Sequence, residues 1–464
     1  MKRPLLLIPW LFSLILAYSS SVSAMAALET RANQAVLDFP NTITFQAQLS
    51  AQVNIQSVVL EYGTTQLTCG EVIAKSFPQF TPGRSVSVEW TWDMRQSGSV
   101  PPGANIWWRW RVIDANGQES VTEVKNITWL DAVYPWQTLA EGDLQVHWYR
   151  GDQAFARQVL AAAQHGLALN QQSAGLKPDG IIDIYIYGDY DALRSAVLYS
   201  PSWTGGQAFP EFNIVIIGIA PDNLEWGQNA VVHELTHVLV GHLTFSCLGD
   251  VPTWLNEGLA VYSEGGLDST SQRQLDQAIR QDTLLTVRSI SGGFSEVADK
   301  ANLSYSQSYS IVKFLVETYG QPKMNELLLS LRDGTPIDSA LVKVYGFDVD
   351  GLEAAWRAGI GAKARATASR PTAMPQPTSV PTIVPVSGLP LAVTPTPFVI
   401  PTSSTAGGNA SEPDLTPPDV PQMQVEMYAW VFIGLACLCL LLVLAVIAVI
   451  VYFIRRRPKE GAHA

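Results

Sequence analysis

The strongest constraint on how this chain folds is a pair of histidines four residues apart inside an apolar segment. His233 and His237 stand in the run Asn229 to His242, where valines and leucines recur at helical spacing. Residues at i and i+4 lie on one helix face, so both imidazoles can reach the same ion. Glu234 stands beside the first histidine, where its carboxylate can take a proton from a metal-bound water. The segment predicts a buried helix that carries a metal site.

A second helical segment supplies a candidate third ligand. A catalytic zinc ion usually has three protein ligands and one open position, so two histidines are too few. Glu257 lies in the run Pro252 to Glu264. Asp250 just before this run and Pro252 at its start are typical of the beginning of a helix. A surface carboxylate is the alternative for Glu257. Glu264, seven residues on, shares its face and either orients a ligand or is simply solvated.

Taken together, His233-Glu-Leu-Thr-His237 and the later Trp254-Leu-Asn-Glu-Gly-Leu-Ala resemble the motifs of the gluzincin metallopeptidases, most closely the peptidase-MA-like members. The resemblance covers about residues 140 to 360. It implies one Zn²⁺ ion held by His233, His237 and Glu257, with Glu234 as the general base, and a peptide or protein substrate. Two imidazoles and a carboxylate also hold other divalent ions, so zinc is inferred from ligand chemistry.

The same resemblance suggests two further parts of the site. The run Tyr305 to Leu315 is similar to the tyrosine-bearing helix of the aminopeptidase branch, which favours Tyr305 over Tyr309 as an oxyanion donor; a packed tyrosine is the alternative. The strand Phe212 to Ile219 is expected to be the edge strand that pairs with substrate. Gly205 to Pro210 lacks the Gly-x-Met-x-Asn motif of that branch. Aminopeptidase activity is therefore unsupported, and endopeptidase and exopeptidase activity both stay open.

The pattern of the chain divides its middle into two domains. Residues 28–132 alternate apolar and polar side chains in short runs between turn signals, which predicts an all-β sandwich of immunoglobulin or fibronectin type. This sandwich either binds a partner or is a spacer packed on the next domain. Residues 133–362 predict an α+β, zincin-like catalytic domain that ends in a helical subdomain. The expected fold is therefore multidomain.

Cysteine usage and charge restrict the surroundings of these domains. Cys69 and Cys247 lie outside the C-terminal apolar run and in different predicted domains. They either form a disulfide or remain separate buried thiols. The net charge of −12 argues against a nucleic-acid partner, because such binding needs a basic surface. The oligomeric state is left open.

Both ends of the chain carry membrane signals. Residues 1–24 predict a secretory signal peptide, with an uncleaved anchor as the alternative. Residues 363–426 are rich in Pro, Thr and Ser and predict a disordered, extended stalk. Residues 427–454 predict one transmembrane helix, and the basic tail at 455–464 predicts a cytoplasmic C-terminus. We therefore expect a single-pass protein of the cell membrane, with its domains outside the cell.

Two functions from different classes follow. The first is a membrane-anchored zinc peptidase, and the second is an inert binding or adhesion protein that keeps the zincin fold as a scaffold. A scaffold needs neither metal ligands nor a base. The presence of both histidines, Glu234 and Glu257 in one chain therefore favours the peptidase.

Overall fold

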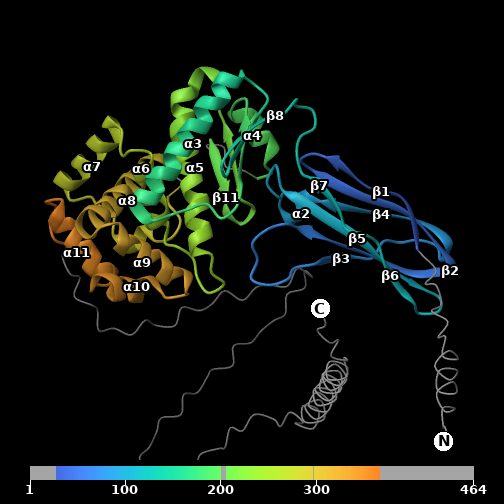
Figure 1. The fold of residues 1–464 in the computed structure, drawn as a ribbon. Helices are drawn as coiled ribbons and strands as arrows, with labels where there is room; N and C mark the ends of the chain where they lie inside the picture. Colours follow the sequence, from blue (N-terminus) through green and yellow to red (C-terminus); the bar gives the residue numbers. More distant parts are fainter. Residues whose placement is uncertain (1–27, 200–204, 296, 366–464) are drawn as a thin grey trace, which may run out of the picture. The chain divides into compact units, whose positions relative to one another are not determined.

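A computed structural model describes residues 28–199, 205–295 and 297–365 (Figure 1). The predicted signal peptide, transmembrane helix and cytoplasmic tail, and all but the first residues of the predicted stalk, lie outside the described residues. Within the described ranges, none of the helices has the length and apolar character needed to cross a bilayer. The membrane anchor therefore stays a prediction.

The N-terminal part is a seven-stranded antiparallel sheet that folds back on itself around one long strand. Its elements are β1 (Glu29–Asp38), β2 (Thr42–Thr64), β3 (Ala74–Ser76), β4 (Gly83–Asp93), the short helix α2 (Met94–Ser97), β5 (Asn105–Asp114), β6 (Glu119–Val121) and β7 (Lys125–Thr128). The first half of β2 pairs with β1 and β4, and the second half pairs with β3 and β5. The inward side chains of both halves form one core, where the Phe45 and Trp108 rings lie 5.5 Å apart. The predicted sandwich is present.

The second part is built on a five-stranded mixed sheet in the order β11-β12-β10-β9-β8. Its strands are β8 (Gln137–Glu141), β9 (Leu144–Trp148), β10 (Ile182–Tyr187), β11 (Gly206–Phe209) and β12 (Ile214–Gly218). β9, β10 and β12 are parallel, whereas β8 and β11 are antiparallel to their neighbours. Ile184 and Ile186 join the core of the helical side, while Tyr185 and Tyr187 join the sandwich core. The sheet is therefore covered on both faces.

After β12 the described chain is almost wholly helical, as predicted. The helices of this part are α3 (Gln153–Ala174), α4 (Tyr190–Ala196), α5 (Leu224–Thr244), α6 (Thr253–Ser263), α7 (Ser269–Gln281), α8 (Ala298–Tyr319), α9 (Gln321–Arg332), α10 (Ile337–Tyr345) and α11 (Val349–Gly359), with 3-10 turns η1 (Pro210–Phe212), η2 (Pro221–Asn223) and η3 (Val287–Ile290). Helix α6 packs tightly on α8, since a Cβ on Gly258 would lie 2.4 Å from the Ser308 carbonyl oxygen. Only glycine permits this approach.

A disulfide joins the two parts. Cys69, between β2 and β3, is bonded to Cys247, which follows α5, across a sequence separation of 178 residues. Close by, the Leu67 backbone N–H donates to the Glu211 carbonyl at 2.8 Å. Of the two alternatives for these cysteines, a disulfide or separate thiols, the structure has the disulfide. This bond ties the sandwich to the end of α5.

The edge strand is not the one that the sequence predicts. The run Phe212 to Ile219 contains β12, which has β10 on one side and β11 on the other. All five residues of β12 are buried, as expected for a central strand whose side chains face two cores. The edge is β11, whose four residues are half-buried and pair with β12 alone among the described strands. The prediction for Phe212 to Ile219 was therefore wrong by one strand.

Candidate metal centre

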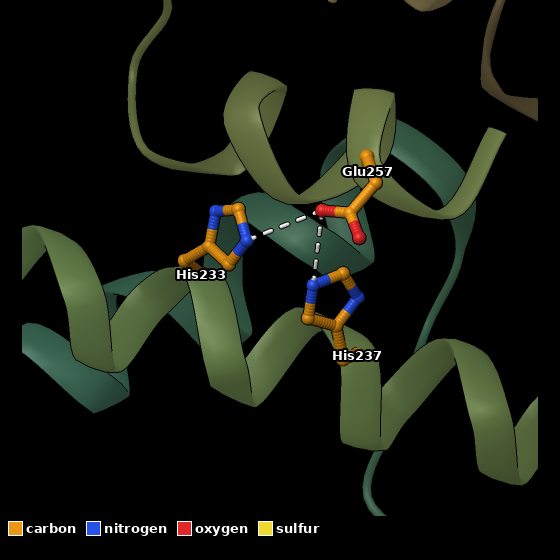
Figure 2. A group of neighbouring side chains, drawn as sticks. All are labelled: His233, His237 and Glu257. Atoms are coloured by element: carbon orange, nitrogen blue, oxygen red, sulfur yellow. Dashed lines mark ion pairs between the residues drawn. The ribbon is translucent and has the colours of Figure 1, made fainter. Parts of the chain in front are cut away.

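Helices α5 and α6 bring the three predicted ligands together (Figure 2). The Nε2 atoms of His233 and His237 each lie 3.4 Å from Glu257 Oε2. The three ligand atoms lie within 4.8 Å of one another. Donors bound to zinc at 2.0–2.1 Å in a tetrahedron are about 3.3–3.4 Å apart, so these separations suit one zinc ion.

Apolar packing holds both helices in place. In α5, Leu235 and Leu239 are buried in the core on the side away from the ligands. In α6, Trp254, Leu255 and Leu259 are buried in the same core. Because these side chains fix each helix along its length, the ligands lie on rigid supports rather than on loops.

Each histidine has a partner at its other ring nitrogen. His233 Nδ1 donates to Glu264 Oε1, and His237 Nδ1 donates to Asn256 Oδ1 at 3.0 Å. These bonds leave the Nε2 lone pairs directed at Glu257, which is how proteins orient metal-binding imidazoles. Glu264 thus contacts a ligand rather than only solvent. Asn256 was not predicted, although its place directly before Glu257 was a usable signal.

The environment of Glu257 tests whether a cation fits. Its side chain is 18% exposed, and its Oε2 atom is buried without a hydrogen-bond partner in the described structure. A buried carboxylate oxygen with no donor is unfavourable unless a cation or a proton donor meets it. Two neutral imidazole nitrogens and this oxygen form the donor set of a catalytic zinc site. The residues therefore fit the ion.

The charges of the cluster shift one another's pKa values. Burial lowers the pKa of His233, but the neighbouring carboxylates of Glu257 and Glu264 outweigh it and raise that pKa well above the usual value. Burial raises the pKa of Glu257, but the neighbouring His237 and His233 outweigh it and hold that pKa below its usual range. Burial raises the pKa of Glu234. The cluster is thus strongly coupled electrostatically.

Glu234 lies in a cleft of about 560 Å³ beside the metal centre and the edge strand. His233, Glu234, Glu264 and Tyr305 line this cleft together with Gly206, the first residue of β11. A Cβ on Gly206 would lie 2.9 Å from Glu234 Oε1, so glycine lets the carboxylate lie against the strand. We call this space the catalytic cleft.

The structure separates the two candidate tyrosines. Tyr305 lines the catalytic cleft, and its ring lies 6.5 Å from the ring of His233. Burial, with Glu257 and Glu234 nearby, raises the pKa of Tyr305, so its hydroxyl stays protonated. Tyr309 instead packs 6.1 Å from Tyr262, with Lys313 Nζ 5.8 Å above its ring. Tyr305 is the better placed donor.

Comparison with known proteins gives one family match. Residues 162–362 match the model of the Peptidase MA superfamily. Among solved structures, an M1 zinc metallopeptidase from Deinococcus radiodurans is 12% identical over 73% of this chain and 92% of its own, with a TM-score of 0.31. An aminopeptidase N family protein from Idiomarina loihiensis is 9% identical over 68% of this chain and 73% of its own, with a TM-score of 0.34. No curated protein gives a significant sequence match.

Proposed function

We propose, from the match of residues 162–362 to the model of the Peptidase MA superfamily, that this chain is a zinc-dependent peptidase with Glu234 as its general base. One observation carries the proposal. His233, His237 and Glu257 converge with their Nε2 and Oε2 atoms at zinc-ligand separations, next to a cleft that holds Glu234. Peptide hydrolysis needs these groups in one place, because a water molecule must be both activated and deprotonated there.

The metal site would be formed by His233, His237 and Glu257. When bound there, zinc supplies Lewis acidity, which makes water a nucleophile near neutral pH and polarises a carbonyl group. Glu264 and Asn256 hold the two imidazoles with Nε2 facing Glu257. The protein thereby keeps the ligand geometry fixed through the reaction.

The remaining steps fall to side chains of the catalytic cleft. Glu234 takes a proton from the attacking water and gives it to the leaving amine, because its carboxylate faces the cleft beside the ligands. Tyr305, which lines the same cleft, donates a hydrogen bond to the tetrahedral oxyanion. Strand β11 pairs with the substrate backbone, which binds peptides without regard to side-chain sequence.

We also propose that the enzyme works outside the cell, anchored by the apolar run at 427–454. The Cys69–Cys247 disulfide supports this location, because such bonds persist in oxidising compartments. The predicted stalk at 363–426 would carry the domains away from the bilayer.

The test uses the purified full chain in detergent. We expect about one zinc per chain by elemental analysis and cleavage of an unbiased peptide library detected by mass spectrometry. Glu234→Gln should keep the zinc and lose cleavage by roughly 10²–10⁴-fold. Glu225→Gln, on the first turn of the same helix, is the matched control and should cleave normally.

Two outcomes contradict the proposal in different ways. If the chain binds zinc and cuts no peptide in the library, the inert binding protein is the better assignment. If the chain binds no zinc, the ligand assignment itself is wrong.

A further inference from the structure

A second cavity, of about 860 Å³, lies between the sandwich and the turn that follows β11. We call it the flank cavity. Its apolar lining comes from both parts of the protein and includes Tyr62, Val72, Trp92, Trp107, Phe209 and Phe212. The metal centre uses none of these residues.

Strand β11 connects the flank cavity to the catalytic cleft. Gly206, at the start of the strand, lines the catalytic cleft beside Glu234, and Phe209, at its end, lines the flank cavity. A strand rises about 3.4 Å per residue, so these two positions are roughly 10 Å apart. A peptide paired with β11 would therefore reach from one cavity to the other within three to four residues.

The direction of such a peptide follows from the pairing. β11 is the edge of its sheet and pairs only with β12 among the described strands, so its outer backbone groups are free to bind a further strand. Antiparallel pairing is the more stable arrangement per residue. An antiparallel substrate runs from Phe209 toward Gly206, which sends the residues before the cleaved bond into the flank cavity.

Strand β11 has no side chain that would hold the amino terminus of the substrate. Its sequence Gly206-Gln-Ala-Phe209 carries no charged side chain, whereas an ammonium group needs a carboxylate or several acceptors to replace its water. Strand β11 itself therefore lets the chain of the substrate continue from Gly206 toward Phe209. The carboxylates near this path, Glu264 and Asp268 in the catalytic cleft and Glu71 and Glu211 at the flank cavity, belong to other segments. The aromatic walls of the flank cavity suit an apolar side chain.

Two links hold the sandwich wall of this cavity in place. The Cys69–Cys247 disulfide ties the segment between β2 and β3 to the end of α5. The hydrogen bond from the Leu67 N–H to the Glu211 carbonyl ties the same segment to the turn after β11. The wall is therefore positioned by the catalytic part before substrate arrives, which lowers the entropy lost on binding.

We propose that the flank cavity binds the apolar side chain of a substrate residue three to four positions before the cleaved bond, so that the enzyme is an endopeptidase. This inference rests on the proposed peptidase function. It assigns the sandwich a part in substrate selection, in place of the role of a spacer.

The test is a series of quenched fluorescent peptides built on one bond that the full chain cuts in the library. The residues after the bond stay constant, and the residues before it increase from one to six, with phenylalanine or serine at the third and fourth positions. Wild-type kcat/KM should rise about 10–100-fold once a phenylalanine reaches these positions, as expected for burial of one large apolar side chain. The serine series should not rise.

Val72 provides variants that leave the catalytic cleft untouched, because its side chain is 66% exposed at the flank cavity. Val72→Asp places a charge in the cavity and Val72→Trp fills it, so both should remove the rise with phenylalanine. Cleavage of the shortest peptides should stay unchanged. Val133→Asp and Val133→Trp are matched controls, because Val133 is 79% exposed and lines neither cavity.

Three outcomes overturn the inference. The flank cavity does not bind substrate if wild-type kcat/KM is independent of the residues before the bond. The same follows if the Val72 and Val133 variants have the same kcat/KM across the series. In both cases the peptidase assignment stands. If wild type cuts no library peptide, the proposed function fails and this inference fails with it.

Discussion

Replacing Glu264 with alanine should weaken zinc binding without disturbing the fold. Glu264 follows the last residue of α6, where its side chain is 24% exposed and accepts from His233 Nδ1. Without that bond the His233 ring can turn and change tautomer, so its Nε2 lone pair is no longer directed at Glu257. The loss should therefore appear in metal affinity rather than in helix packing.

The size of the effect follows from the two histidine partners. Removing a partner behind a metal-binding histidine typically lowers metal affinity by about 10–100-fold. Bonds to a charged acceptor are roughly twice as strong as neutral ones. Glu264→Ala removes a carboxylate and should cost about 100-fold, or about 2.7 kcal/mol. Asn256→Ala removes the amide bound to His237 and should cost about 10-fold, or about 1.4 kcal/mol.

The assay is competition for zinc between the full chain and a chromophoric chelator at one fixed pH. Glu326→Ala is the control, since Glu326 is a surface carboxylate on α9 paired with Lys323. Its zinc affinity should equal that of wild type. Wild-type affinity in Glu264→Ala, or a larger loss in Asn256→Ala, would refute the assignment of these partners.

Two further predictions concern the oxyanion donor and acid stability. Tyr305→Phe should lower kcat by about 10²–10³-fold with zinc affinity unchanged, whereas Tyr309→Phe should stay near wild type; equal losses in steady-state assays would contradict the choice of Tyr305. Hydrogen bonds from Arg111 and Arg109 lower the pKa of the buried Glu61 carboxyl to about 2. The ionised carboxyl therefore contributes about 3 kcal/mol to the free energy of unfolding above pH 5, and this contribution is lost as the pH falls toward 2. Between pH 6 and pH 2.5, the free energy of urea unfolding should fall less for Glu61→Gln than for wild type. Equal decreases would show that the ion pairs of Glu61 do not set the acid sensitivity.

The elements that the sequence predicted well are those whose signals are local. The apolar positions around His233 and His237 recur at helical spacing. The helix in the structure, Leu224–Thr244, is only a few residues longer than the predicted run Asn229 to His242. The segment around Glu257 is likewise a helix with an apolar buried face. The need of a catalytic zinc ion for a third ligand suggested that the two helices converge, and the resemblance to gluzincins supported it. Their closeness depends on tertiary packing that no spacing within either segment reveals.

The features that escaped prediction depend on contacts between distant segments. Strand β11 has no apolar alternation, and its extended form comes from pairing with β12, so the longer apolar run was mistaken for the edge. Cys69 and Cys247 lie in different parts of the protein, and only the folded arrangement brings them together. The partner of His233 also depends on how α5 meets α6. Sequence periodicity predicts on which face of a helix or strand a residue lies, but not which other segment packs against that face.

The charge balance of the site favours a metal centre over a scaffold without metal. Three carboxylates, those of Glu234, Glu257 and Glu264, surround two imidazoles, and Glu257 Oε2 is buried without a donor. Even with both imidazoles protonated, three carboxylates leave an excess of negative charge in a buried place, which opposes folding unless a further cation balances it. A scaffold would be more stable with neutral or apolar residues at these positions, because such replacements remove the burial penalty. Under the proposed function, a cation at the centre of these five ionisable groups accounts for their presence together, and a substrate paired with β11 accounts for the position of Glu234 beside the edge strand.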